Sequence, residues 1–115
     1  MQINSVGTAR RDQREIDVET FTRSDVTVVD TREGVFNEAG DAYAAREAVK
    51  PEDVSELSSV VVGKAPGRSN DKQITMFKSV GTGIQDIAIA AGLYQKAKER
   101  GTGTDLGDFP YLNET

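Results

Sequence analysis

The sequence predicts an α/β fold in which short parallel strands alternate with helices. Residues 25–30 and 74–79 form two β-branched or apolar runs with the length and composition of buried strands. Helical patterns lie between and after these runs, and the last of them is the most regular. Such alternation is typical of a parallel sheet covered by helices. With 115 residues, the chain is the size of one small domain or of part of a larger one.

The first half of the chain predicts two strands and a short helix. The first strand covers residues 2–7 and stops at a glycine. Asp17 precedes the sequence "VETFTRS" and is expected to cap a short helix there. The run at 25–30, "DVTVVD", is β-branched and closed by a carboxylate, as expected for a strand buried in a parallel sheet.

The middle of the chain predicts two further helices. Composition favours a helix over residues 41–49, and Gly34 and Gly40 argue for breaks before it. Pro51 ends this helix and suits the first turn of the next one, where acidic side chains follow it. The sequence leaves open whether "VVVG" at 60–63 is a last helical turn or a short strand.

The last third holds the clearest elements. A polar loop at 64–73 leads into the third expected strand, at 74–79. Apolar residues then recur at helical spacing from Ile84 to Ala97, which predicts a long helix with Thr82 as a candidate N-cap. Basic residues lie at the C-terminal end of this helix, and Gly101 suits the position just after it. Only three short strands are expected, so the predicted sheet resembles half of a larger one.

Composition excludes several classes of function. The chain carries 14 basic and 19 acidic side chains, and a net charge of −5 disfavours binding to nucleic acid or to anionic membranes. It contains no cysteine and no histidine, which removes disulfides, thiol nucleophiles, the usual catalytic triad and most zinc sites. Without a membrane-spanning stretch or a signal-peptide pattern, we expect a soluble cytoplasmic protein.

The segment "KSVGTG" at 78–83 is the most informative motif. A glycine turn between a strand and a helix presents unpaired N–H groups to an anion, and Ser79 adds a hydroxyl. On the local pattern alone, the favoured interpretation is that Gly81 and Gly83 only make a tight turn between strand and helix. A third glycine at position 86 would complete a dinucleotide fingerprint, but Asp86 stands there and would repel a pyrophosphate. Alternation places Lys78 and Ser79 on opposite faces of the strand, and Ser79 is the better site candidate.

Two other groups of residues are candidates for a binding site. The first strand ends at Val6, Gly7 and Thr8, and ligands of open α/β sheets bind at the carboxyl ends of strands. An ordinary strand-to-loop turn is the alternative. Asp30 and Asp41, with neighbouring glutamates, suggest a metal site, but their spacing matches no known cation loop and a solvated acidic face is the favoured interpretation.

In this order, the segments "INSVGTARRDQREID", "VVVDTREGVFNEAGD", "VVVGKAPGR" and "ITMFKSVGTGIQDIAIA" resemble the ornithine cyclodeaminase/mu-crystallin family. This family includes archaeal alanine dehydrogenases and ketimine reductases. The resemblance covers residues 2–101 and concerns the C-terminal portion of these proteins. It implies the C-terminal half of a Rossmann-type NAD(P)-binding domain over residues 1–101, with a long C-terminal helix, and a tail at 102–115.

The resemblance also implies roles for individual residues. Val6, Gly7 and Thr8 would line NAD or NADP near the nicotinamide, Ser79 would contact the cofactor, and Val80 would lie beside the substrate. No residue of this chain is expected to be catalytic, and no metal is implied.

The cyclodeaminases carry a catalytic aspartate two residues after the position of Gly7, where this chain has Ala9. The resemblance therefore implies an imine-reducing or amino-acid-deaminating enzyme rather than an ornithine cyclase. The substrate would be an amino acid or imine, and the family is typically homodimeric. The phosphate-binding and substrate-binding parts of the family are not in this sequence, so we expect no activity from this chain by itself. The alternative is a non-catalytic or split subunit that pairs with a chain carrying those parts.

Overall fold

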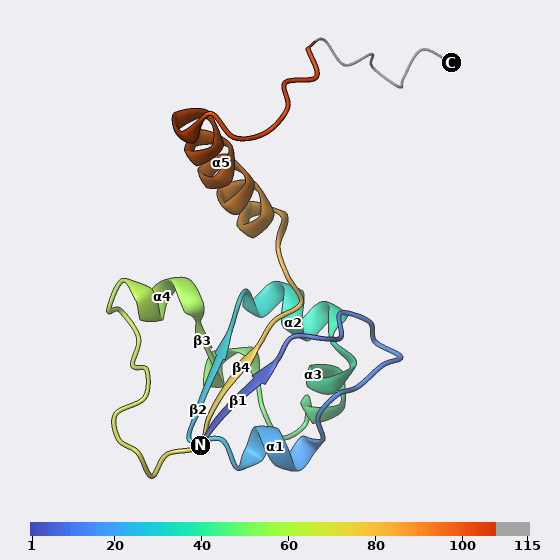
Figure 1. Cartoon of the computed structure of the whole chain (residues 1–115). Coiled ribbons are helices and arrows are strands. Elements are labelled where there is room, and N and C mark those ends of the chain that lie inside the picture. The colour runs from blue at the N-terminus through green and yellow to red at the C-terminus, as the bar shows by residue number, and fades with distance from the viewer. Residues whose placement is uncertain (108–115) are drawn as a thin grey trace. The chain divides into compact units, whose positions relative to one another are not determined.

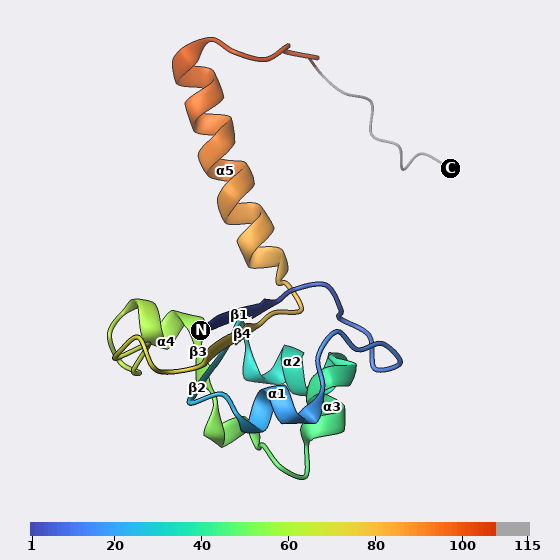
Figure 2. The same cartoon turned by 60° about the horizontal axis from the view of Figure 1, so that its bottom comes forward.

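The computed structural model describes residues 1–107 and shows an α/β arrangement (Figures 1 and 2). The chain divides into two compact units, residues 1–82 and residues from Gly83 onward. In the first unit the elements follow one another as β1 (Gln2–Ser5), α1 (Val18–Thr22), β2 (Val26–Val29), α2 (Arg32–Glu38), α3 (Gly40–Ala45), a 3-10 turn η1 (Pro51–Asp53), β3 (Ser55–Glu56), α4 (Leu57–Val61) and β4 (Thr75–Lys78). The second unit holds α5 (Gly83–Arg100).

The sheet has four parallel strands in the order β1-β4-β2-β3. The three expected strands are confirmed, and β3 is a fourth that the sequence did not predict. In the register, Ser5 of β1 and Val29 of β2 both pair with Lys78 of β4. Because the strands are parallel, their carboxyl ends lie along one edge of the sheet.

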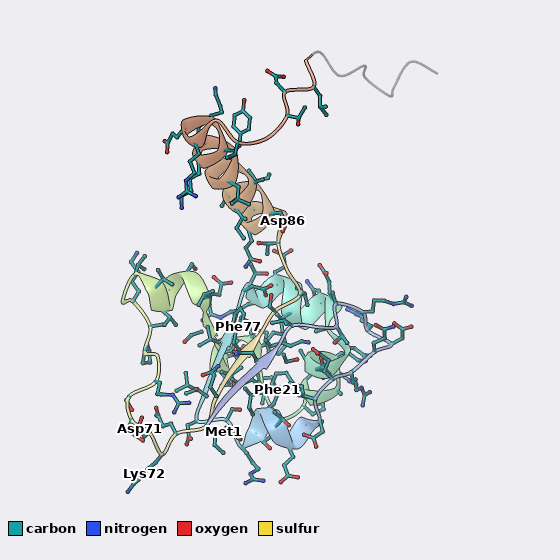
Figure 3. The ribbon with its side chains drawn as sticks, in the orientation of Figure 1. Met1, Phe21, Asp71, Lys72, Phe77 and Asp86 are labelled. Carbon is teal, nitrogen blue, oxygen red and sulfur yellow. The ribbon has the colours of Figure 1, made fainter. Side chains whose placement is uncertain are left out.

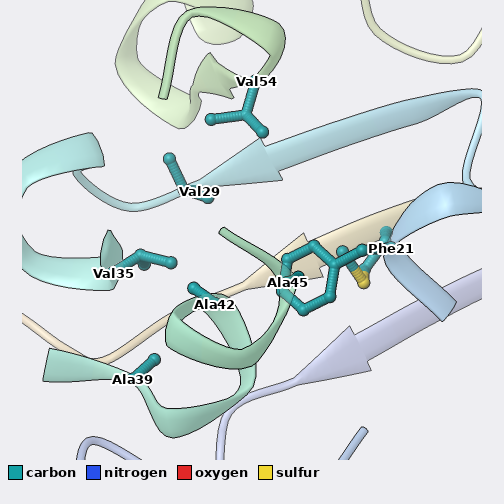
Figure 4. Close-up of a cluster of buried hydrophobic side chains, with 8 residues drawn as sticks. Phe21, Val29, Val35, Ala39, Ala42, Ala45 and Val54 are labelled. Atoms are coloured by element: carbon teal, nitrogen blue, oxygen red, sulfur yellow. The ribbon is translucent and has the colours of Figure 1, made fainter. Parts of the chain in front are cut away.

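One face of the sheet carries the core. Helices α1, α2 and α3 lie on this face, and their apolar side chains meet those of β2 and β4 (Figures 2 and 4). The buried members are Phe21, Val29, Val35, Ala39, Ala42, Ala45, Val54 and Met76. Three of the eight are alanine, whose small side chain lets the helices approach the sheet closely, and the core is small.

The opposite face is covered by α4 and by the loop after it, which contributes Gly67 and Arg68, and it is only half-buried. Val26, Val28 and Phe77 point to this side, and Leu57 and Val60 of α4 line a groove with them. The alternation of buried and half-buried residues along β2 follows from this difference in cover.

Side-chain caps fix two of the short helices. Asp17 accepts a hydrogen bond from the Thr20 N–H at 2.8 Å, which confirms the predicted cap of α1. Thr31 caps α2 in the same way by accepting from the Gly34 N–H. The prediction that Gly34 interrupts helical structure is therefore wrong. The glycine lies in the first turn of α2, where the cap outweighs its poor helix propensity.

Residues 41–63 differ most from expectation. Helix α3 begins at Gly40 and ends at Ala45, four residues before the predicted end. After Pro51 the chain makes a 3-10 turn and the two-residue strand β3 instead of a helix. The open alternative at 60–63 resolves as the end of α4 followed by a turn, with Gly63 at a φ of 72°.

The second unit is the long helix that the periodicity predicts. It runs over 18 residues and Gly101 follows it with a φ of 61°, as expected of a glycine that ends a helix. Its large apolar side chains, Ile84, Ile87, Ile89, Leu93 and Tyr94, are all exposed in the described part of the chain. Residues 108–115 of the predicted tail lie outside the described residues. No helix within residues 1–107 is long and apolar enough to cross a membrane.

Candidate functional site

The carboxyl edge of the sheet brings the predicted site segments together. The Ser79 N–H donates to the Ser5 carbonyl at 3.0 Å, and the Asp30 N–H donates to the Lys78 carbonyl at 3.3 Å. Residues 6–8 and 79–81 therefore leave neighbouring strands side by side, and Asp30 leaves the strand on the other side of β4. Sequence reasoning predicted the edge and its two segments, although they lie more than 70 positions apart.

The Asp30 carboxylate occupies the anion-binding position that the turn after β4 forms. Its Oδ2 accepts from the Ser79 hydroxyl at 2.8 Å, from the Val80 N–H at 2.9 Å and from the Gly81 N–H at 2.7 Å. Its Oδ1 accepts from the Thr31 N–H at 2.8 Å. The glycine turn thus binds an anion, as its pattern predicts, but that anion is a carboxylate of the protein itself.

Lys78 lies on the core face of β4, and its side chain is fully buried. The ammonium group forms an ion pair with Asp41 at 2.8 Å. It also lies 3.1 Å from Ser5 Oγ and from the Thr8 carbonyl oxygen, and 3.3 Å from Glu15 Oε2. A buried ammonium needs such compensation because burial without a partner costs several kcal/mol.

The same charged groups hold both ends of the loop at 6–16. At one end, the Gly7 N–H donates to Glu15 Oε2 at 2.8 Å and the Thr8 hydroxyl donates to Asp41 Oδ2 at 2.9 Å. At the other end, Asp41 Oδ1 accepts from the N–H groups of Glu15 at 2.7 Å and Ile16 at 3.1 Å. The loop that carries the candidate ligand residues is therefore fixed to a charge cluster centred on the buried Lys78 and Asp41. We call it the Lys78 cluster: Ser5, Thr8, Glu15, Asp41 and Lys78.

The hydrogen bonds of this cluster shift the pKa values of two carboxyl groups. Burial alone would raise the pKa of Asp41, but bonds from Lys78 and from the backbone N–H groups of Ile16 and Glu15 outweigh it and hold that pKa below its ordinary value. The pKa of Glu15 is also lowered, chiefly by the Ser5 hydroxyl and the Gly7 N–H. Both groups are carboxylates at neutral pH.

The predicted site residues differ in what they offer a ligand. The Val6 side chain is 64% exposed, Val80 is half-buried, and Ser79 keeps about 9% of its surface exposed. The Gly7 N–H and the Thr8 hydroxyl donate to Glu15 and Asp41, and the Thr8 carbonyl accepts from Lys78. The edge thus presents two valine side chains and the remaining surface of one serine.

Sequence reasoning missed that the acidic residues support the edge. Asp30 and Asp41 are 7% and 1% exposed, so the solvated acidic face favoured for them is wrong. No group of three metal-ligating side chains occurs among residues 1–107. The available signal was positional: Asp30 directly follows a buried strand, and Lys78 has the same register parity as Met76, which points into the core.

The sequence model that describes the "Ornithine cyclodeaminase/mu-crystallin family" matches residues 1–101 of this chain. The chain belongs to this family. The resemblance stated from the four sequence segments is confirmed, and so is the α/β fold with a parallel sheet.

Solved structures of this family resemble the chain closely. A Thermococcus litoralis Delta(1)-pyrroline-2-carboxylate reductase in complex with NADH and L-proline is 43% identical, with a TM-score of 0.82, and the match covers 92% of this chain and 33% of that one. An iminosuccinate reductase of Paracoccus denitrificans in complex with NAD+ is 28% identical, with a TM-score of 0.78 and coverage of 94% and 33%. A Delta(1)-pyrroline-2-carboxylate reductase of Bacillus cereus is 37% identical over 106 residues, which are 90% of this chain and 33% of that protein. The chain thus spans about a third of the length of these relatives.

Proposed function

We propose that this chain forms the nicotinamide-facing half of an NAD(P)-binding domain in an enzyme that reduces a cyclic imine bearing a carboxylate. The observation that carries the proposal is the convergence of residues 6–8 and 79–80 at one carboxyl edge, where Ser79 bonds to the Ser5 carbonyl. The similarity to two pyrroline-2-carboxylate reductases supports the substrate class. Ala9, in place of the cyclodeaminase aspartate, also favours reduction over ornithine cyclisation.

The residues at the edge fit a nicotinamide ring. When bound, NADH or NADPH supplies the hydride. The exposed Val6 and the half-buried Val80 offer apolar contacts to a flat ring, and Ser79 offers one polar atom. Gly7 and Thr8 line the ring's approach with their backbone, which the Lys78 cluster holds in place. In this proposal Val80 also borders the substrate.

We propose further that the chain has no turnover by itself and functions with the phosphate-binding and substrate-binding parts of the family, in a homodimer. The alternative is a non-catalytic or split subunit that pairs with a separate chain carrying those parts. Turnover of any amino acid with NAD by the purified 115-residue chain would contradict the first statement.

An NADH fluorescence titration of the chain tests the proposed site, with far-UV circular dichroism on the same sample. We expect saturable binding by a folded chain, and loss of this binding in Val6→Asp. Val62→Asp is the matched control because Val62 has the same exposed fraction, 64%, but lies at the end of α4. A folded chain that does not bind NADH would favour the split-subunit alternative, and equal loss in both variants would argue against the edge as the site.

A further inference from the structure

The hydrogen bonds around Ser79 determine which kind of group it can recognise. A serine hydroxyl has one proton to donate and two lone pairs that accept. The Ser79 Oγ lies 2.8 Å from Asp30 Oδ2, and the Asp30 side chain is buried. Where the hydroxyl proton points therefore depends on whether this carboxylate oxygen is a donor or an acceptor.

Asp30 Oδ2 can only accept. Two backbone N–H groups, of Val80 at 2.9 Å and Gly81 at 2.7 Å, already point at the same oxygen. A proton on this oxygen would face two other protons, so Oδ2 acts as the acceptor and the Ser79 hydroxyl must donate to it. The proton of Ser79 is thus fully committed inside the protein.

One of the two lone pairs of Ser79 is also in use. The Gly81 N–H lies 3.1 Å from Ser79 Oγ and shares its proton between this oxygen and Asp30. One lone pair remains for a ligand. Toward the carboxyl edge, Ser79 is therefore a hydrogen-bond acceptor and cannot act as a donor.

We propose that Ser79 recognises the N–H₂ group of the nicotinamide carboxamide, and that Asp30 is a positioning residue that enforces this polarity. This inference rests on the proposed function and deepens it, because it names the group that is recognised. The carboxamide carries two N–H donors, whereas its carbonyl oxygen would meet a lone pair of Ser79 and be repelled. Asp30 acts without touching the cofactor, through the direction of one hydroxyl proton.

The test compares two reduced dinucleotides on the full chain. NADH carries the carboxamide, and the reduced 3-acetylpyridine analogue replaces its N–H₂ by a methyl group and keeps the carbonyl. We expect the wild-type chain to bind NADH about three- to tenfold more tightly than the analogue, the value of one hydrogen bond. In Ser79→Ala this preference should disappear. Ser69→Ala, on the exposed loop before β4, is the control that should keep it.

The outcomes separate this inference from the proposed function. If NADH and the analogue bind the wild-type chain equally, the polarity inference is overturned while the proposed cofactor site stands. If neither binds a folded chain, the proposed cofactor site fails for the chain by itself, as the split-subunit alternative expects, and the exchange rate of the Ser79 hydroxyl proton then decides the polarity inference. A preference that survives in Ser79→Ala would assign it to another residue and also overturn the inference.

A second measurement needs no cofactor. Nuclear magnetic resonance of the wild-type chain should detect a Ser79 hydroxyl proton that exchanges slowly with water because it is hydrogen-bonded to the Asp30 carboxylate. A hydroxyl proton that exchanges as fast as that of Ser69 would show that the proton is free, and the acceptor-only role would be refuted.

Discussion

The ion pair of Lys78 and Asp41 supports the sharpest prediction about stability. Both side chains are fully buried, and their charged atoms are 2.8 Å apart. Lys78→Met removes the ammonium group and leaves the Asp41 carboxylate buried without its cation. Breaking a buried pair on one side costs about 3–5 kcal/mol, because the remaining charge stays uncompensated. For a small domain this is a large part of the total free energy of unfolding.

Urea denaturation followed by circular dichroism measures this effect. With a urea dependence of about 2 kcal/mol per M, the loss corresponds to a fall of the midpoint by about 2 M. Lys72→Met is the matched control because Lys72 is exposed on the loop before β4 (Figure 3), and its midpoint should stay at the wild-type value. A loss below about 1 kcal/mol in Lys78→Met would refute the reasoning.

A double variant separates charge from packing. Asp41→Asn keeps an oxygen that accepts from the backbone N–H groups of the 6–16 loop but carries no charge. In Lys78→Met combined with Asp41→Asn no buried charge is left unpaired between these two positions. We expect the double variant to be more stable than Lys78→Met alone, with a coupling of about 1–3 kcal/mol. A double variant that is as unstable as the sum of the single losses would assign the cost to packing.

The remaining predictions concern the loop contacts and the turn after β4. Gly40→Ala should destabilise the chain strongly in thermal unfolding, because a Cβ there would overlap the backbone carbonyl of Gln13. The lowered pKa values of Asp41 and Glu15 stabilise the fold above the unfolded-state values of about 4, and this stability is lost as the pH falls through the folded-state values. The free energy of unfolding should thus be flat from about pH 7 to 5 and then fall. Asp30→Ala should cost at least about 2 kcal/mol and accelerate amide exchange in the turn that follows β4.

Each of these predictions has a control. Gly67→Ala should be tolerated, since a Cβ there lies 3.4 Å from Val60 in ordinary contact. Asp41→Asn should reduce the acid-induced loss, and an unchanged pH profile would contradict the role of this carboxylate. Asp71→Ala, on the exposed loop, should leave amide exchange after β4 unchanged, and equal effects of this variant and Asp30→Ala would argue against the carboxylate as the turn's anchor.

The sequence predicted the elements that carry a local signal. The strands at β1, β2 and β4 show as apolar runs, Asp17 marks the start of α1, and α5 shows as a helical period. Strand β3 has only two residues, too few for any periodicity, and exists because it pairs with β2. Its presence depends on a contact that is distant in the sequence, so no local pattern could predict it.

The residues of the candidate site also differ in whether a local sequence pattern predicts them. The two ligand segments have local signals, a glycine after each strand and a hydroxyl beside it. The residues that hold them do not: Asp41 is 37 positions from Lys78, and Asp30 is 49 positions from Ser79. Their charges were visible in the sequence, but which groups would meet depends on the order of strands in the sheet. The partners of Lys78 and Ser79 are therefore set by the fold and not by any local sequence pattern.

For the proposed function, the internal carboxylates also bear on which part of a dinucleotide would lie at this edge. Asp30, Glu15 and Asp41 stand against a single ammonium, so the side chains that hold the edge together carry a net negative charge. The backbone N–H groups that would attract a phosphate in the turn after β4 already bind Asp30. A pyrophosphate would meet repulsion from Asp30 there, whereas a nicotinamide ring, neutral when reduced and positive when oxidised, would not. In the proposed function, the charge arrangement thus favours the nicotinamide end of the cofactor at this edge, with the phosphates held elsewhere.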